Sequence, residues 1–280
     1  MAVVLALMSA VVYGASDFLG GLSSRRASVF GVVAVSQLVG LVALVLLLPW
    51  LGGPVGPADL AWGVAAGLAG ASGLLVFFRA LATGVMSVVA PVTAVTAAAV
   101  PVLVGLVSGN SIGPWAAVGI ALALVAVVLV SAEGGLSALR AARPASLVPA
   151  LVAGAAFGVF FVLLDRTSTD SGLTPLVATR LASVTLVLLV ALVGRQAVRV
   201  GRPALPLVAV SGMGDMTANA LFLLATQQPG QLAITGVLAS LYPVSTVVLA
   251  QLVLRERLAR AQVAGLGTAV AAVVLITLPG

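Results

Sequence analysis

Long apolar runs, separated by short polar segments, fill the chain from end to end. A run of about 20 apolar residues is long enough to cross about 30 Å of hydrocarbon as an α-helix. Runs such as VALVLLLPW and LALVAVVLV do not alternate between apolar and polar positions, which favours helices over the strands of a membrane β-barrel. The pattern therefore predicts ten transmembrane helices over residues 2–22, 29–49, 60–80, 84–107, 114–131, 148–166, 174–194, 205–226, 231–254 and 261–278.

The first apolar run has the length of a signal peptide as well as that of a membrane helix. It lacks a positively charged N-terminal region, and it carries Asp17 and a Gly-Gly pair where a cleavage site would lie. We therefore expect it to be retained as the first transmembrane helix.

A long segment of the first half returns in the second half. Residues 80–129 match residues 226–275, and a polar break lies at the same place in both copies, SGNSIGPW in the first and LRERLARA in the second. The matched glycines are Gly84 with Gly230 and Gly119 with Gly265. A duplicated half with weak internal symmetry is a sequence mark of many transporter folds.

Each copy would contain five helices, which is an odd number. The second copy must then cross the membrane upside down relative to the first, as in transporters with inverted repeats. The expected fold is an all-α integral membrane protein with two inverted five-helix repeats, at 1–131 and 148–280, joined by a cytoplasmic loop at 132–147.

The composition agrees with a chain that lies in a lipid bilayer. Apolar residues make up 62% of the chain and charged residues only 7%, whereas soluble domains have about 45–50% and about 25%. The chain has no cysteine and no histidine, which excludes disulfides, thiolate metal sites and the usual neutral-pH base. Abundant Ala, Val, Gly and Arg without Lys is typical of a GC-rich gene, so we expect a bacterial inner membrane protein.

Arginines favour one set of loops. The loops after the first, fifth, seventh and ninth helices and the end of the third helix carry Arg25, Arg26, Arg140, Arg143, Arg195, Arg199, Arg202, Arg255, Arg257, Arg260 and Arg79. The opposite loops carry only Arg166. Because positive residues favour the cytoplasmic side, the arginines predict that both termini lie outside the cytoplasm.

Charged residues inside the predicted helices are the first candidates for a binding site. A charge at the middle of a bilayer costs at least about 2.5–3.5 kcal/mol on insertion scales, so it usually lines a cavity or has a partner. Asp215 lies near the middle of its helix, with Asn219 one turn further on. Asp17 follows Tyr13 by one turn, and Arg180 lies in the seventh helix, where its guanidinium suits a carboxylate or phosphate.

A structural role is the alternative for each of these charges. Asp215 and Arg180 would then form a buried ion pair that fixes packing. Asp17 would instead cap its helix or pair with Arg25 or Arg26 near the cytoplasmic surface. The sequence leaves both interpretations open.

Uncharged polar residues form a second group of candidates. Gln37, Thr93, Thr96 and Tyr242 all lie within predicted spans. The fourth and ninth helices are repeat partners, so the two threonines and the tyrosine are candidates to face a shared cavity. The alternative is again structural, because threonine often bonds a carbonyl of its own helix and tyrosine often lies at a membrane interface.

Four stretches carry a resemblance to a known family. They are YGASDFLGGLSSRR from Tyr13, SVVAPVTAV from Ser87, TPLVATRLASVTLVLLV from Thr174, and LVLRERL from Leu252 followed by QVAGLGTAVAAVVL. Their order resembles the EamA-type ten-helix members of the drug/metabolite transporter superfamily over nearly the whole chain. SGNSIGPW departs from the pattern, since a Gly-Glu-Arg break is expected there. Such proteins are usually drawn with both termini in the cytoplasm, so the orientation stays open.

The resemblance implies a secondary transporter that works by alternating access and exports a small polar metabolite, such as an amino acid. Asp215 or Asp17 would exchange a proton if transport is proton-coupled. The alternatives are a multidrug or toxic-compound efflux carrier, or a non-transporting membrane protein such as a lipid scramblase. No phosphate-binding loop, enzyme site, cofactor site, metal site or nucleic-acid surface is visible in the sequence, and we expect a monomer.

Overall fold

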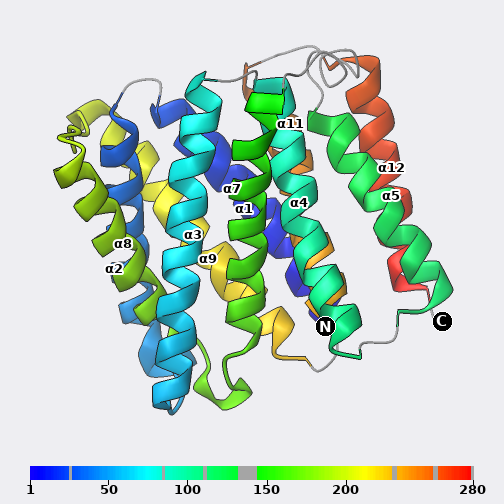
Figure 1. Ribbon diagram of the computed structural model, residues 1–280, viewed down its shortest axis with the longest axis horizontal. Helices are drawn as coiled ribbons and strands as arrows, with labels where there is room; N and C mark the ends of the chain where they lie inside the picture. The colour runs from blue at the N-terminus through cyan, green and yellow to red at the C-terminus, as the bar shows by residue number, and fades with distance from the viewer. Residues whose placement is uncertain are drawn as a thin grey trace.

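The protein is a bundle of long helices that lie side by side (Figure 1), described here by a computed structural model. The structure describes residues 1–24, 27–83, 86–109, 112–131, 144–228, 232–254 and 258–278. The first half contains α1 (Ala2–Ser24), α2 (Val29–Leu51), α3 (Pro57–Thr83), α4 (Met86–Val107) and α5 (Pro114–Ser131). The second half contains α7 (Pro144–Asp165), α8 (Pro175–Val193), α9 (Leu205–Thr226), α10 (Leu232–Ala239), α11 (Tyr242–Leu254) and α12 (Arg260–Thr277).

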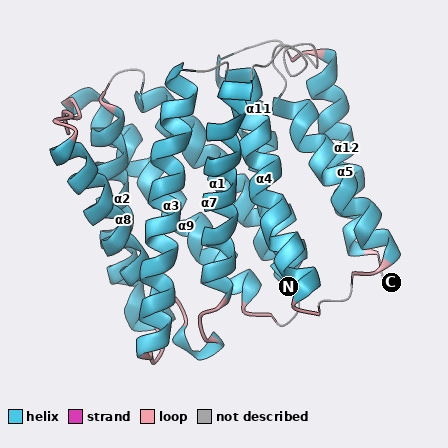
Figure 2. Cartoon of the chain, viewed as in Figure 1, coloured by secondary structure: helices cyan, strands magenta, loops and turns pink. Residues whose placement is uncertain are grey.

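The prediction of an all-helical membrane protein is confirmed. Within the described ranges, nine helical segments are long and apolar enough to cross a membrane, and α4 adds a shorter apolar stretch at Val92–Val107. Figure 2 shows only helices and loops in these ranges. Most helices begin and end within a few residues of the expected spans, because continuous apolar runs can only satisfy their backbone groups in lipid as helices. The helix α7 begins at Pro144, earlier than the expected span at 148.

The expected single helix at 231–254 is wrong in one respect, because it is interrupted. Residues Ser240 and Leu241 form a turn between α10 and α11. Pro243 has no backbone N–H and so cannot bond the carbonyl of Ala239. The amide of Leu241 bonds the carbonyl of Leu238 at 3.2 Å, a tighter spacing than that of an α-helix.

The helices of one half pack mainly against helices of the other half. The helix α1 lies against α9, α10 and α11, and α7 lies against α3 and α4. The helix α2 contacts both α8 and α9, α3 contacts α8, and α5 and α12 form a pair at one edge of the bundle (Figure 1). Gly212 lets α9 approach α2 closely, because a Cβ there would collide with the backbone carbonyl of Ser36.

Two large apolar clusters fill the bundle. One joins α1, α4, α5, α10 and α12 and includes Ile120, Val127 and Leu238. The other joins α2, α3, α7, α8 and α9 and includes Leu44 and Phe222, both fully buried. Large apolar side chains also cover the outer surfaces of the helices, as expected for helices that face lipid.

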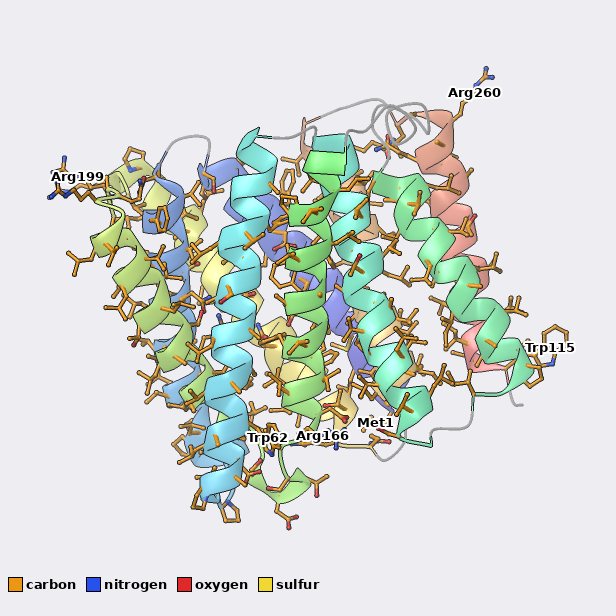
Figure 3. All side chains as sticks on the ribbon, viewed as in Figure 1. Met1, Trp62, Trp115, Arg166, Arg199 and Arg260 are labelled. Atoms are coloured by element: carbon orange, nitrogen blue, oxygen red, sulfur yellow. The ribbon has the colours of Figure 1, made fainter. Side chains whose placement is uncertain are left out.

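Labelled side chains mark the two ends of the bundle. Arg199 and Arg260 extend from one end, while Met1, Trp62, Trp115 and Arg166 lie at the other (Figure 3). Met1 and the last turn of α12 lie at the end opposite Arg199 and Arg260 (Figures 1 and 3). Loops of the two halves meet at both ends, where the amide of Gly53 bonds the carbonyl of Ser171 and the amide of Ser28 bonds the carbonyl of Arg199.

Candidate functional site

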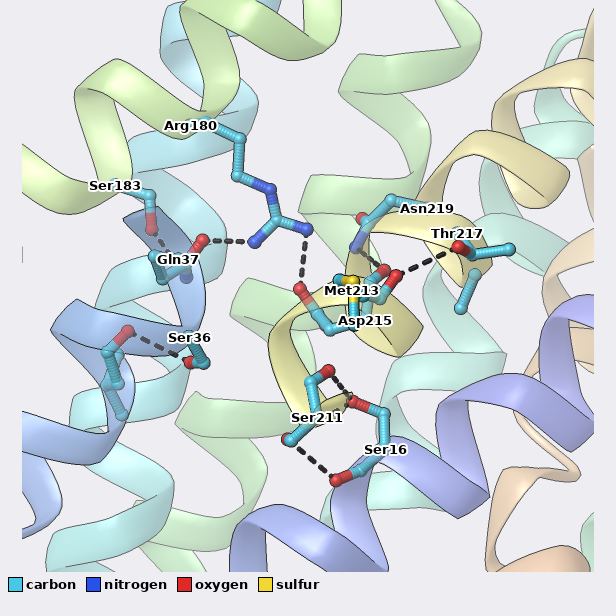
Figure 4. Close-up of polar contacts among 12 residues, drawn as sticks. Ser16, Ser36, Gln37, Arg180, Ser183, Ser211, Met213, Asp215, Thr217 and Asn219 are labelled. Carbon is cyan, nitrogen blue, oxygen red and sulfur yellow. Dashed lines mark hydrogen bonds and ion pairs between the residues drawn. The ribbon is translucent and has the colours of Figure 1, made fainter. Parts of the chain in front are cut away.

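An ion pair inside the bundle is the centre of the candidate site. Nη2 of Arg180 on α8 lies 2.5 Å from Oδ2 of Asp215 on α9 (Figure 4). The arginine side chain is 5% exposed, whereas the aspartate side chain is 35% exposed. Asp215 is near the middle of α9, so its partly exposed side chain lies at the depth of the helix centre. The carboxylate is therefore neither fully enclosed by its partner nor at a helix end.

A glutamine holds the arginine from the other side. Nη1 of Arg180 donates a hydrogen bond to Oε1 of Gln37 on α2, and Nε2 of Gln37 donates to Oγ of Ser183 at 2.9 Å. The chain of contacts runs from α8 through α2 back to α8 and across to α9 (Figure 4). Because the guanidinium has partners on two helices, its position is fixed before any ligand arrives.

Close helix approach makes this contact chain possible. Gly40 on α2 and Gly212 on α9 face each other, since a Cβ at Gly40 would lie 3.0 Å from the carbonyl oxygen of Gly212. Gly212 precedes Asp215 by less than one turn, and Gly40 follows Gln37 by less than one turn. The small residues therefore bring the two helices together beside the polar side chains that bind Arg180.

The side chain of Asn219 bonds the backbone of its own helix. Its Nδ2 donates to the backbone carbonyl of Asp215 at 2.7 Å, and the residue is buried. The amide thus lies beside the ion pair, as its spacing predicted, but bonds the main chain of Asp215 instead of its carboxylate (Figure 4). It supports the shape of α9 where the acidic side chain leaves the helix.

Asp17 faces the same region from α1. The side chain is exposed, and α1, which carries it, packs against α9 and α11. The exposed apolar side chains of α1 form a separate stripe at Val4, Met8 and Val11. Asp17 is therefore directed toward neighbouring helices and away from the lipid side of its own helix.

Pairing of Asp17 with Arg25 or Arg26 was the alternative, and both arginines lie outside the described residues. Within the described part of the chain, Asp17 makes no hydrogen bond and no ion pair.

Tyr13 lies one helical turn before Asp17 on α1. Its hydroxyl is buried and has no hydrogen-bond partner among the described residues. Its ring packs edge-on against Phe161 of α7, with ring centres 6.5 Å apart. Tyr13 and Asp17 lie on α1, which packs against α9, the helix that carries Asp215.

The two threonines lie in other contacts. Oγ1 of Thr93 donates to the carbonyl of Ala150 on α7 at 3.1 Å, and Oγ1 of Thr96 donates to Val92 of its own helix at 2.7 Å. These contacts fit the structural alternative for threonine in a membrane helix. Of the three residues expected to face a shared cavity, Tyr242 packs its backbone against Gly14 of α1, and the threonines bond backbone carbonyls of α7 and α4.

Three serines of the site were not singled out from the sequence. Ser183 holds Gln37, while Ser16 and Ser211 bond each other's backbone carbonyls across α1 and α9 at 2.5 Å and 2.9 Å (Figure 4). Serine is common in membrane helices and usually bonds its own helix. Only the neighbouring acidic residues, Asp17 beside Ser16 and Asp215 one turn after Ser211, offered a signal.

The described residues hold no group of three His, Cys, Asp or Glu side chains that is placed to bind a metal ion. What the geometry provides is one fixed cation, Arg180, paired with the partly exposed carboxylate of Asp215. Such a set suits recognition of a small charged molecule by ion pairing and hydrogen bonding.

Comparisons with known proteins agree with this architecture. The model of the EamA-like transporter family matches residues 1–132 and again residues 145–278. A solved structure described as "Crystal structure of protein" aligns with a TM-score of 0.79 at 17% identity, over 98% of this chain and 95% of that chain. At this identity the likeness shows the fold alone. No curated protein matches the chain.

Proposed function

Because the chain belongs to the EamA-like transporter family, we propose that it is a secondary transporter that exports a small polar metabolite, such as an amino acid, across a bacterial inner membrane. The protein works by alternating access, in which the two halves expose a central site first to one side and then to the other. The observation that carries this proposal is the accessible carboxylate of Asp215, ion-paired to Arg180 at mid-helix.

The packing pattern supports two inverted repeats of five spans, with α10 and α11 counted as one. If each helix is replaced by its counterpart in the other half, the contact between α1 and α9 becomes the contact between α7 and α3. Both contacts are extensive. In the same way, the contact between α2 and α9 corresponds to the contact between α8 and α3. The contact between α4 and α7 corresponds to the contact of α10 and α11 with α1. The family model matches each half separately, as a duplication requires.

The arginine-bearing end of the bundle is the cytoplasmic end in this proposal. Arg199 and Arg260 extend from the end opposite Met1 (Figure 3), in agreement with the arginine bias of the sequence. The positive-inside rule then puts both termini outside. A thiol-specific label added to cells that carry a cysteine at position 2 would test this orientation.

Arg180 is the group we assign to the carboxylate of an amino-acid substrate. In the absence of substrate, Asp215 occupies the guanidinium and Gln37 fixes its orientation. An incoming carboxylate competes with Asp215 for Arg180. Once displaced, Asp215 is without its counter-ion, and we assign it to proton exchange during transport. Exchange of partners at Arg180 thus links substrate binding to proton uptake.

The experiment that tests this function is transport of radiolabelled amino acids into proteoliposomes, under a pH gradient and without one. Arg180→Gln is expected to lower the initial rate by about tenfold or more, because one charge-assisted hydrogen bond is worth about a factor of ten. Arg199→Gln, on an exposed loop, is the matched control and should leave the rate unchanged.

A variant with one unpaired charge can also fail to fold. The double variant Arg180→Gln/Asp215→Asn removes both charges and leaves neither unpaired. We expect it to recover thermal stability in detergent without recovering transport. Recovery of both would show that the pair only fixes packing, and the assignment of Arg180 and Asp215 to the substrate site would then be wrong.

A further inference from the structure

The segment between α8 and α9 carries three arginines at one edge of the bundle. We call residues 194–204 the arginine loop, after Arg195, Arg199 and Arg202, which are all exposed. The arginine loop contains no acidic residue, and none of its arginines forms an ion pair with the described part of the chain. The loop therefore presents positive charge that the described residues leave unpaired.

The start of α2 fixes the backbone of the arginine loop. The hydroxyl of Ser28 donates to the carbonyl of Ala197 at 2.5 Å, and the amide of Ser28 donates to the carbonyl of Arg199 at 3.3 Å. The amide of Arg199 donates back to Oγ of Ser28 at 3.2 Å. Because these bonds hold the loop before a ligand arrives, less conformational freedom is lost when its arginines bind.

Arg195 adopts a backbone conformation that favours glycine. Its φ is 51°, in the left-handed region. The amide of Arg195 bonds the carbonyl of Leu192 at 3.1 Å, and the amide of Gln196 bonds the carbonyl of Ala191 at 2.8 Å. This is the pattern of a Schellman helix end, whose left-handed position is usually glycine. Gly194 lies one residue earlier, so an arginine occupies the strained position. Strain of this kind is typical of residues with a function.

The arginine loop lies where lipid headgroups can reach it. The last two residues of α8, Leu192 and Val193, are exposed and apolar, as expected for a helix end in contact with lipid. Arg199 extends outward from the edge of the bundle formed by α2 and α8 (Figure 3). Arg180 lies roughly 20 Å away along the axis of α8. The loop is therefore separate from the candidate substrate site.

We infer that the arginine loop binds the phosphate headgroup of an anionic lipid such as phosphatidylglycerol. A guanidinium donates two parallel hydrogen bonds to a phosphate, and arginines near an anionic membrane surface are attracted to it. The positive-inside rule requires only positive charge in this segment. It requires neither a backbone held by Ser28 nor an arginine at a position that favours glycine. The inference is independent of the molecule that is transported.

Native mass spectrometry of the full-length protein in detergent tests this inference. The protein is titrated with dioleoylphosphatidylglycerol and with dioleoylphosphatidylcholine, which have the same acyl chains and differ in net headgroup charge. We expect the first phosphatidylglycerol to bind about tenfold more tightly than phosphatidylcholine. The variant Arg195→Gln/Arg199→Gln/Arg202→Gln should bind the two lipids within about twofold of each other, because each arginine near an anionic surface contributes about a factor of five.

The matched control removes an equal charge from another cluster. Arg255→Gln/Arg257→Gln/Arg260→Gln changes three arginines around Arg260, which lies at the same end of the bundle as Arg199 (Figure 3). This control should keep the tenfold preference for phosphatidylglycerol. An equal loss in the two triple variants would show that binding follows overall charge and would overturn the arginine loop as a site.

Arg195→Gly separates lipid binding from a role in the fold. Glycine relieves the left-handed conformation, so thermal stability in detergent without added lipid should stay the same or rise. The affinity for phosphatidylglycerol should fall about fivefold, because one guanidinium is lost. Lower stability with unchanged lipid affinity would show that Arg195 only supports the end of α8, which contradicts the inference.

Two further outcomes would overturn the inference. Equal affinity of the parent for the two lipids would show that the headgroup charge is not recognised. Displacement of phosphatidylglycerol by inorganic phosphate at millimolar concentration would show a site for a small free anion and not for a lipid. Retention of the lipid under these conditions, together with its loss in the arginine-loop variant, is the expected result.

Discussion

Asp59 on α3 accepts two hydrogen bonds from Ser168, one from its backbone amide at 2.7 Å and one from its hydroxyl at 3.0 Å. The same carboxylate accepts a third from the amide of Gly56 at 3.0 Å, in the first turn of the helix. The residue is buried. One acidic side chain therefore caps α3 in the first half and holds the loop that follows α7 in the second half.

Asp59→Ala is expected to lower the free energy of unfolding by about 1–3 kcal/mol, because it removes a helix cap and leaves buried donors without an acceptor. Chemical unfolding in mixed micelles measures this change. Asp170→Ala is the matched control, since Asp170 is exposed in the same loop. Equal stability of the two variants would contradict a structural role for Asp59.

The helices could be predicted from the sequence because lipid leaves the backbone few alternatives. Apolar runs gave the positions of α1, α2, α5 and α9 within a few residues. The interruption between α10 and α11 was missed, because one continuous span was predicted through the polar residues Ser240 and Tyr242. Pro243 was the available signal, but Pro49 and Pro149 lie inside α2 and α7 without a break in the helix.

The charged part of the site could be predicted only as a set of candidates. Intramembrane charge identified Arg180, Asp215 and Asp17, but pairing depends on which faces of α1, α8 and α9 meet. That depends on packing at small residues such as Gly212, whose neighbour Ser36 lies far away in sequence. The role of Ser183 in holding Gln37 could not be read from spacing for the same reason.

Asp17 should react with water-soluble reagents when it is replaced by cysteine. The chain has no cysteine of its own, so Asp17→Cys carries a unique thiol. We expect it to react with a membrane-impermeant methanethiosulfonate in nanodiscs about tenfold faster than two controls, because only a hydrated thiol forms the reactive thiolate. Ser16→Cys is buried against α9, and Val11→Cys is 59% exposed on the lipid side of the same helix.

The outcome of this labelling separates two environments for the exposed carboxylate. Fast reaction at position 17 alone means that Asp17 meets water inside the bundle. Reaction at position 11 as fast as at position 17 would mean that the outer surface of α1 is in water, which contradicts its assignment as a lipid-facing helix.

Gln37→Glu should change the preference of the site between leucine and leucinamide. Gln37 is the second partner of Arg180, and a carboxylate there would compete with the substrate carboxylate for the guanidinium. We expect the dissociation constant of leucine to rise about tenfold relative to that of leucinamide, which has no carboxylate. Calorimetry with both compounds measures the ratio.

Ser183→Ala is the control for Gln37→Glu. It removes the neutral partner of Gln37 and adds no charge. The ratio of the two dissociation constants should stay within about twofold of that of the parent, because Arg180 keeps both of its acceptors. A ratio that shifts equally in both variants would show that the effect comes from the orientation of residue 37 and not from its charge.

Gly212→Ala should destabilise the protein and weaken leucine binding together. The new Cβ would collide with the backbone carbonyl of Ser36, so α9 must move away from α2. Overpacking of this kind costs about 1–3 kcal/mol, and the shift would separate Asp215 on α9 from the Arg180 that Gln37 holds from α2. Thermal unfolding and calorimetry with leucine measure the two effects.

Gly267→Ala is the matched control for this helix contact. A Cβ at Gly267 of α12 meets no atom within 4 Å, and alanine is a better helix former than glycine by about 1 kcal/mol. Stability should therefore stay the same or rise, with leucine binding unchanged. If Gly212→Ala behaved like Gly267→Ala in both measurements, the contact of α9 with α2 would not be what positions the ion pair.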